Sequence, residues 1–448
     1  MNLATIRELY KEPDCSHNAQ KTDKTCPRPT PGRAAGGCSF DGAQITLVPI
    51  TDAAHIVHGP IGCVGNTWNN RGSLSSGSSL YRKGFTTNLN NNDIVFGGEK
   101  KLFKAVKEIA KAHNPPAIFV YQTCVTSMIG DDIEALCKAA TEKFGVKVIP
   151  VDSPGFTGTK NFGNRLAGDA LLKHLIGTEE PKNDHPYNVN FIGEFNIAGE
   201  QWEMVRLLDE VGIRLISSLS GDARVREVGM MHRAQVNMMV CSRALLNVAR
   251  RMKEDYDIPY FEGSFYGAKN TTKTILTIAE YMNDPALMKK AEAICKAEYE
   301  KVKPELDELK AKLAGKKVLL YTGGVKSWSV VAALQELGME VIATGTKKST
   351  EEDKQRIQEL MGSEATMISE GSPAKLLELC RSMGADMMLA GGRNQYTALK
   401  AGIPFVDVNQ ERHIPFAGYT GHVILGRTIL GALESPAFKL VKRPNPFI

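Results

Sequence analysis

Short, mostly apolar runs alternate with helix-like segments along most of this chain. Residues 117–121 and 236–240 are two such runs, and each is followed by a stretch with helical spacing of its apolar residues. Short apolar runs of this kind are typical of strands that are buried on both faces of a parallel sheet. The alternation therefore predicts an α/β fold in which helices cover both faces of parallel sheets.

The alternation occurs in three blocks. The predicted strands are residues 45–48, 117–121 and 146–151 in the first block, 189–195, 213–217 and 236–240 in the second, and 316–321, 341–344, 386–390 and 404–408 in the third. Polar residues 179–187 separate the first two blocks. A charged helix over residues 286–313 bridges the second and third; Asp284-Pro285 begins it, and Pro304 is expected to kink or split it.

We therefore predict three doubly wound, Rossmann-like domains at residues 37–185, 186–315 and 316–448, preceded by a polar tail at residues 1–36. A chain of 448 residues is long enough for this number of domains. The domain boundaries fall where composition becomes polar or where the long charged helix ends.

Composition excludes several classes of function. The formal charge of +5 is small for this length, which argues against a dedicated nucleic-acid binder. No run approaches the roughly eighteen apolar residues of a membrane span, and the N-terminus does not resemble a secretory signal. We therefore expect a cytoplasmic protein, in which nine cysteines are buried thiols, metal ligands or redox groups rather than disulfides.

Cys241 stands where the strand-like residues 236–240 give way to a helix-like run. Open α/β sheets bind ligands at the carboxyl ends of their strands, so a thiolate at this point could anchor one iron of a large cluster. Cys38, Cys63 and Cys124 lie far upstream, in glycine-rich segments or after a strand. Glycine beside a ligating cysteine lets backbone amides approach inorganic sulfide. The four cysteines suggest two metal sites.

The spacing of these cysteines does not decide between metal ligands and buried thiols, because no Cys-x-x-Cys is present and free cysteine is commonly buried. Three ligands also fall short of the four that a cubane cluster takes, so another chain would supply the fourth. Cys137, Cys295 and Cys380 lie in helical patterns and are predicted core residues. Cys15 and Cys26 remain either transient metal contacts or exposed thiols.

Three segments around the upstream cysteines together resemble the α-type subunits of the nitrogenase family: residues 37–43, 55–63 and 124–132. The resemblance covers nearly the whole chain. Within the family it is strongest to the scaffold-type α subunits, on which the iron–molybdenum cofactor matures. The segments that support this placement are residues 155–161, 237–242, 261–267, 321–329 and 407–412.

The resemblance implies a set of cofactors. Cys38, Cys63 and Cys124 match the residues that ligate a [4Fe–4S] cluster shared with a β-type partner. Cys241 matches the ligand of the terminal iron of the catalytic cofactor, and in a scaffold it would hold the all-iron (8Fe) precursor in a pocket between the domains. Molybdenum and homocitrate would then be added to the precursor in transient steps.

The resemblance also implies partners. They are the β-type scaffold subunit NifN in an α2β2 heterotetramer, the ATP-dependent nitrogenase iron protein, the radical enzyme NifB as precursor donor, and apo-nitrogenase or carrier proteins as acceptors. Independent catalysis is not expected. The alternative is the catalytic α subunit of a nitrogenase or nitrogenase-like reductase, and a metal-free metabolite-binding protein is a third hypothesis.

Departures from the catalytic subunit separate the first two hypotheses. Nitrogenase anchors its cofactor through cysteine at one end and through histidine at the molybdenum end, where this chain has Asn409, a much poorer ligand. Asn164 stands at the position of a histidine that faces the reacting side of the cofactor, and Lys160 at that of a nearby glutamine. The resemblance thus predicts one covalent tether and a far end that stays free.

Basic residues are expected to neutralise the anionic precursor and homocitrate. Arg71 matches a residue that the family retains, whereas Arg393 and Asn394 replace a Lys-Glu pair near the organic acid. Each could equally be a solvated surface residue, and Lys326 is a weaker candidate. His413 and His422 fall near the expected far end and could assist molybdenum capture, or serve only in a loop or a helix; His58 is expected to be structural.

Overall fold

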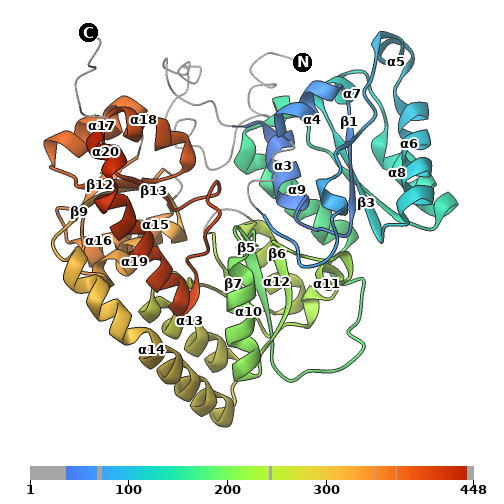
Figure 1. The fold of residues 1–448 in the computed structure, drawn as a ribbon. Coiled ribbons are helices and arrows are strands. Elements are labelled where there is room, and N and C mark those ends of the chain that lie inside the picture. Colours follow the sequence, from blue (N-terminus) through green and yellow to red (C-terminus); the bar gives the residue numbers. More distant parts are fainter. Residues whose placement is uncertain (1–36, 68–72, 242–244, 348, 370, 441–448) are drawn as a thin grey trace, which may run out of the picture.

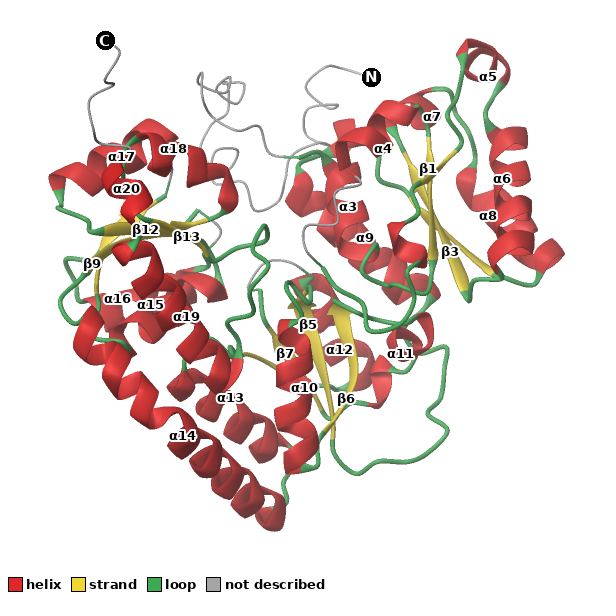
Figure 2. Ribbon diagram, in the orientation of Figure 1, coloured by secondary structure: helices red, strands yellow, loops and turns green. Residues whose placement is uncertain are grey.

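The computed structural model describes residues 37–67, 73–241, 245–347, 349–369 and 371–440. This part of the chain contains three separate sheets, and every strand pairing within them is parallel. Each sheet carries helices on its faces, as Figure 2 shows with strands in yellow and helices in red. The prediction of three doubly wound parallel-sheet units is confirmed.

The first sheet has the strand order β2-β1-β3-β4. One face packs against α6 and α8 and the other against α3 and α9, so Ile118 and Val120 face one core and Phe119 and Tyr121 the other. The elements of this unit are α3 (Ser39–Leu47), β1 (Ala54–His58), α4 (Ile61–Thr67), β2 (Phe85–Thr86), α5 (Asn91–Phe96), α6 (Glu99–His113), β3 (Ala117–Gln122), α7 (Cys124–Met128), α8 (Ile133–Phe144), β4 (Lys147–Val151) and α9 (Lys160–His174).

The second sheet has the order β6-β5-β7-β8. Its face with Ile192, Leu219 and Met239 shares a continuous core with the first sheet, through α3, α9, α11 and α12. Its other face packs against α10 and α13. The elements are β5 (Asn188–Glu194), α10 (Glu200–Val211), β6 (Arg214–Ser220), α11 (Val225–Gly229), β7 (Val236–Met239), α12 (Leu246–Tyr256), β8 (Tyr260–Glu262) and α13 (Ala268–Tyr281).

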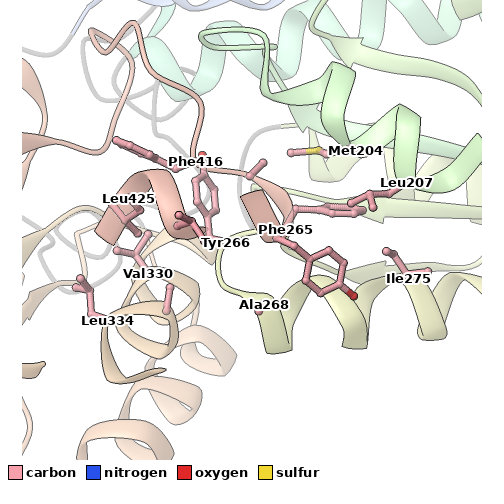
Figure 3. Close-up of a cluster of buried hydrophobic side chains, with 14 of the residues drawn as sticks. Met204, Leu207, Phe265, Tyr266, Ala268, Ile275, Val330, Leu334, Phe416 and Leu425 are labelled. Carbon is pink, nitrogen blue, oxygen red and sulfur yellow. The ribbon is translucent and has the colours of Figure 1, made fainter. Parts of the chain in front are cut away.

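The third sheet has the order β11-β10-β9-β12-β13. One face joins the second sheet in the largest apolar core, part of which is drawn in Figure 3, and the other packs against α17 and α18. The elements are β9 (Lys317–Tyr321), α15 (Val325–Glu336), β10 (Glu340–Gly345), α16 (Glu351–Met361), β11 (Thr366–Ile368), α17 (Pro373–Ser382), β12 (Met387–Ala390), α18 (Gln395–Lys400), β13 (Phe405–Asp407), α19 (Gly418–Glu434) and α20 (Pro436–Leu440).

The long helix α14 (Pro285–Leu313) connects the second sheet to the third and runs along the edge of the molecule in Figure 1. Asp284 caps it by accepting hydrogen bonds from the backbone of Ala286 and Leu287, and a proline occupies the first turn, as predicted. Pro304 lies inside the helix without splitting it. The helix packs against α10 and α19, so it braces both units.

One predicted strand is wrong. Residues 45–48 do not form a strand, because residues up to Leu47 belong to helix α3 and Val48 follows it. This helix is buried on nearly every side, so its sequence has the continuous apolar run of a buried strand. Glycines allow the close packing against α9: a side chain at Gly42 would lie 1.9 Å from the carbonyl oxygen of Lys160.

Several strands were not predicted: β1, β2, β8 and β11. Three of them are only two or three residues long, and β1 carries His55 and His58, which interrupt its apolar pattern.

In the described part of the chain no helix combines the length and the apolar character that a membrane crossing requires. The tail at residues 1–36, with Cys15 and Cys26, lies outside the described residues, and the domain boundaries stay a prediction.

Candidate functional site

Each sheet has a point at which its strand order reverses direction. These points lie between β1 and β3, between β5 and β7, and between β9 and β12. Loops leave neighbouring strands in opposite directions there, which opens the crevice where open α/β sheets bind ligands. Four of the described candidate residues follow these strands: Cys63 and Cys124 in the first unit, Cys241 in the second, and Arg393 in the third.

Three cysteines stand at the starts of helices. Cys38 is the N-cap of α3, Cys63 is the third residue of α4, and Cys124 is the first residue of α7. The N-terminus of a helix carries a partial positive charge and free N–H groups, which stabilise a nearby anion. These positions therefore suit an anionic group, such as an iron–sulfur cluster, bound to the three sulfurs.

The sulfur atoms of Cys38 and Cys124 converge on Gly155, in the turn Gly155–Thr157. A Cβ atom placed on Gly155 would lie 3.0 Å from Cys124 Sγ and 3.1 Å from Cys38 Sγ, so the two sulfurs are at most about 6 Å apart. A Cβ atom at this position would be in unusually tight contact with both sulfurs, which would have to shift by a few tenths of an ångström. Glycine is therefore favoured here by the two sulfurs rather than by the backbone conformation.

Cys63 is the third member of this group. Burial raises the pKa of its thiol, and the nearby thiols of Cys124 and Cys38 raise it further. The three thiols therefore lie close enough to repel one another when ionised. Among the described residues no three His, Cys, Asp or Glu side chains gather closely enough to hold a single metal ion. The arrangement instead suits a cluster, in which each cysteine binds a different iron.

Exposed apolar side chains surround the three cysteines. Ile61 begins α4 and is 60% exposed, Met128 ends α7 and is 78% exposed, and Phe156 follows Gly155 and is 47% exposed. Single exposed apolar residues are ordinary, but several close to one partly exposed group of thiols are of the kind that protein interfaces bury. We call Ile61, Met128 and Phe156 the apolar rim.

His58 supports this region as a structural residue. Its Nε2 lies 2.9 Å from the Asp131 carboxylate and its Nδ1 lies 3.1 Å from the Thr87 hydroxyl. Asp131 also accepts a hydrogen bond from the backbone of Gly98. Burial lowers the pKa of His58, although the Asp131 charge opposes this. Both ring nitrogens are engaged, so the structure agrees with a structural role.

Cys241 lies two residues beyond the end of β7 and is partly exposed. The backbone of β5 approaches it closely: a Cβ atom on Gly193 would lie 2.9 Å from Cys241 Cβ and 3.0 Å from its backbone nitrogen. The preceding Val240 donates a hydrogen bond to the carbonyl of Ile192. Cys241 is thus held at the strand-order reversal of the second sheet, where its thiol can act as a tether.

Lys160 and Asn164 lie in the first turns of α9, against α3. The Lys160 ammonium is 4.0 Å from the Asp41 carboxylate, and its backbone N–H donates to the carbonyl of Gly37. The Asn164 side chain contacts Thr46 and, with its amide oriented to satisfy its neighbours, donates to the carbonyl of Gly42. Helix α9 also packs against α12, which follows Cys241.

Asn409 and Arg393 lie together in the third unit. The Asn409 amide nitrogen would be 3.3 Å from a Cβ atom on Gly391, two residues before the exposed Arg393. The backbone N–H of Asn409 donates to Asp407 at 2.6 Å. Both residues therefore stand beyond the carboxyl ends of neighbouring strands, β13 and β12. Arg71 lies outside the described residues.

The two histidines near this region have different settings. His422 is buried, with Nδ1 accepting from the backbone of Ala268 and Nε2 contacting the carbonyl of Ala333. Burial lowers its pKa to about 4. His422 is therefore a packing residue of α19. His413 is exposed in the loop that follows Asn409.

Comparison with known proteins identifies the family to which this chain belongs. A profile of the family described as "Nitrogenase component 1 type Oxidoreductase" matches residues 38–434. The chain belongs to this family. Cys38, the N-cap of α3, is the first residue of the match, so the match takes in the three cysteines, the Cys241 region and the Asn409 loop. The resemblance seen in the sequence is confirmed.

Two curated relatives within the nitrogenase component 1 family are 53% identical to this chain. Both are described as the nitrogenase iron-molybdenum cofactor biosynthesis protein NifE. The Rippkaea orientalis protein covers 99% of this chain and 95% of its own length, and the Klebsiella pneumoniae protein covers 96% of each. A solved structure described as nitrogenase Cp1 at pH 6.5 is 27% identical, covers 95% of this chain and 93% of its own, and has a TM-score of 0.85.

Several residues of this nitrogenase component 1 site were not predicted. Gly155 appears in the sequence as one more turn glycine, and only the fold brings it between two sulfurs. In the sequence, Glu200 looks like an ordinary acidic residue at the start of a helix, and Arg412 like an ordinary basic residue in a loop. In the structure both are buried, and they form an ion pair. A fully buried charge carries no sequence signature, so no pattern could have identified this pair.

Proposed function

We propose that this chain is the α-type scaffold subunit on which an iron–sulfur precursor matures into the iron–molybdenum cofactor. The observation that carries the proposal is the contrast between Cys241, a soft sulfur ligand, and Asn409, a neutral amide where a second anchor would be needed. Support comes from the relatives at 53% identity, which are described as cofactor biosynthesis proteins. One firm ligand suits a cargo that must later leave.

The residues present fit a resident [4Fe–4S] cluster at the three-cysteine site. Cys38, Cys63 and Cys124 would hold it, and the apolar rim supports a partner chain that contributes the remaining ligand. A bound cluster of this kind supplies a one-electron relay. The chain's own contribution is to keep three thiols together at helix N-termini and to keep Gly155 free of a side chain.

The partner that we propose is the β-type subunit NifN, in an α2β2 heterotetramer. Ile61, Met128 and Phe156 form an apolar surface beside the half-exposed thiols, and protein interfaces bury such surfaces at their centres.

A second exposed apolar group, Val95 and Phe96 on α5, suits contact with the nitrogenase iron protein. NifB would deliver the precursor, and apo-nitrogenase or carrier proteins would accept the product, all in the cytoplasm.

The cargo is the 8Fe precursor, bound through Cys241. Lys160, Arg71 and Arg393 supply positive charge for the cargo and for homocitrate, while Asn164 and Asn409 leave the far end without a strong metal ligand. Molybdenum and homocitrate are added there. In this proposal the chain holds and orients the cargo and is not itself the catalyst.

The competing function is that of a catalytic α subunit. The family name and the TM-score of 0.85 to a nitrogenase structure make it a real alternative. The test is to assay the anaerobically purified complex with iron protein and ATP. Maturation of added precursor with little acetylene or dinitrogen reduction supports the scaffold, whereas robust reduction of either gas overturns it. Iron analysis of the same material excludes a metal-free protein if iron is stoichiometric.

A further inference from the structure

A buried group of charged residues lies where the second and third units meet. Glu200 begins α10 and is 1% exposed, and Arg412 follows β13 and is 4% exposed. Their side chains form an ion pair. Tyr266, just before α13, bridges them, because its hydroxyl donates to Glu200 at 2.7 Å and contacts Arg412 at 3.0 Å.

This pair holds both ends of the loop that carries Asn409. Arg412 donates through Nη1 to the carbonyl oxygens of Asn409 and Val408. At the other end of the loop, the backbone N–H of Phe416 donates to Glu200 Oε1 at 2.9 Å. One carboxylate on α10 therefore fixes residues 408–416 of the third unit, once directly and once through Arg412.

The rings beneath the guanidinium fix its orientation. The Arg412 guanidinium carbon lies 5.6 Å from the centre of the Phe416 ring and 5.9 Å from that of Tyr266, and Figure 3 shows both rings within the apolar core. Arginine in such a setting offers a planar fork that lysine cannot reproduce. Its donors are thereby aimed at the loop.

The buried charged residues also extend to strand β5, beside Cys241. Glu194, next to the Gly193 that touches Cys241, accepts hydrogen bonds from the backbone of Phe195 and Asn196. The charges of Glu200 and Arg412 act on it, as does that of Lys326, whose ammonium lies 4.8 Å from the centre of the Tyr266 ring. Buried charges thus extend from the strand beside Cys241 to the Asn409 loop.

Stability alone is a poor explanation for this pair. Replacing a buried ion pair by apolar side chains is often neutral or stabilising, whereas removing one partner is costly. We propose that Glu200 and Arg412 are positioning residues that hold residues 408–416, and with them Asn409, at a fixed place relative to Cys241. The link to function rests on the proposed scaffold role: there, the pair contributes to modification of the cargo and not to its capture.

The first test needs no cargo. In the complete heterotetramer, amide hydrogen exchange in residues 408–416 is compared between the native protein, Arg412→Lys and Glu200→Gln. Arg356→Lys is the matched control, because Arg356 on α16 pairs with Glu262 on β8 at 2.9 Å and so also joins the two units. We expect about tenfold faster exchange in Arg412→Lys and no change in Arg356→Lys, a ratio equivalent to roughly 1.4 kcal/mol.

Equal exchange in Arg412→Lys and the native protein would overturn the positioning role. The paired variant Glu200→Gln/Arg412→Met leaves no unpaired buried charge and guards against failure to fold; it too should exchange faster in this loop alone. Faster exchange throughout the chain would mean that the pair is only structural, which also overturns the proposal.

The second test uses loaded protein. Arg412→Lys should keep the precursor iron bound through Cys241 and lose about tenfold in molybdenum incorporation, with Arg356→Lys unchanged. Normal incorporation in spite of a loosened loop would overturn the link to cargo modification. Absence of molybdenum uptake in the native complex would instead refute the proposed function, and the exchange result would stand by itself.

Discussion

The three-cysteine site and the Cys241–Asn409 region differ in the number of firm ligands that they offer. At the first, Cys38 and Cys124 converge on Gly155 and Cys63 lies near both. At the second, one sulfur stands at the end of one sheet and an amide at the end of another. Both use the same kind of sheet crevice. In the proposed function, ligand chemistry rather than fold would then separate permanent binding at the first site from temporary binding at the second.

The largest expected effect is at the three-cysteine site. Cys124→Ala should remove most of the resident-cluster iron and weaken pairing with the partner subunit, because two sulfurs cannot hold a group built for several ligands. Iron quantitation, paramagnetic resonance and the oligomeric state of the anaerobic complex measure this. Cys137→Ala is the control, since this thiol is buried in the core of the first unit. Unchanged iron and an intact heterotetramer in Cys124→Ala would contradict the assignment.

Cys241→Ala should affect the Cys241–Asn409 region and leave the three-cysteine site unchanged. The variant is expected to lose nearly all of the precursor iron while it keeps the spectroscopic signal of the resident cluster, since Cys241 follows a strand of the second sheet whereas Cys38, Cys63 and Cys124 belong to the first unit. Iron content before and after loading with precursor is the measurement. Loss of both signals together would show that the sites are not independent.

Asn409→His should make the second region resemble the first. An imidazole at this position adds a good ligand for a transition metal where the native chain has a weak one. We expect transfer of the matured cargo to an acceptor to slow by about tenfold or more, which corresponds to only 1.4 kcal/mol of added binding free energy. Gln358→His, at an exposed neutral position of α16 in the same unit, is the control for the addition of a histidine outside the site. Equal transfer rates would show that the far end is not at Asn409.

The smallest effect concerns the buried charges of the second region. Burial raises the pKa of Glu194 to about 7 in the folded protein, and Glu200 adds to the shift. Its contribution to the free energy of unfolding is therefore complete below about pH 4.5 and is lost as the pH rises to about 7. Glu194→Gln stays neutral, so denaturant unfolding should show a shallower loss of stability over this range, on the order of 1 kcal/mol. Glu108→Gln, on the exposed face of α6, should keep the native slope.

Most of the longer strands were predictable from the sequence because buried parallel strands have a characteristic apolar pattern. Strands β3, β4, β9 and β12 follow that pattern closely. The same pattern failed for α3, since a helix buried on nearly all sides lacks a polar face. The spacing of apolar residues cannot by itself distinguish a buried strand from a buried helix whose packing partner, here α9, is distant in sequence.

The candidate site was predictable only in part. Cys38, Cys63, Cys124 and Cys241 stand out because thiols in glycine-rich or strand-end settings are chemically distinctive. Their convergence depends on connections between elements that are far apart in the sequence. The Glu200–Arg412 pair was not predictable, because 211 intervening residues separate its members and each looks like a surface charge.

Gly155 has a consequence for handling the protein. Because Gly155 has no side chain, none from this residue separates Cys38 Sγ from Cys124 Sγ, and both cysteines are partly open to solvent. Neighbouring accessible thiols are readily oxidised, and an oxidised sulfur can no longer bind iron. We therefore expect the bare polypeptide to be sensitive to air before any iron is bound, and to require a reductant as soon as the chain folds.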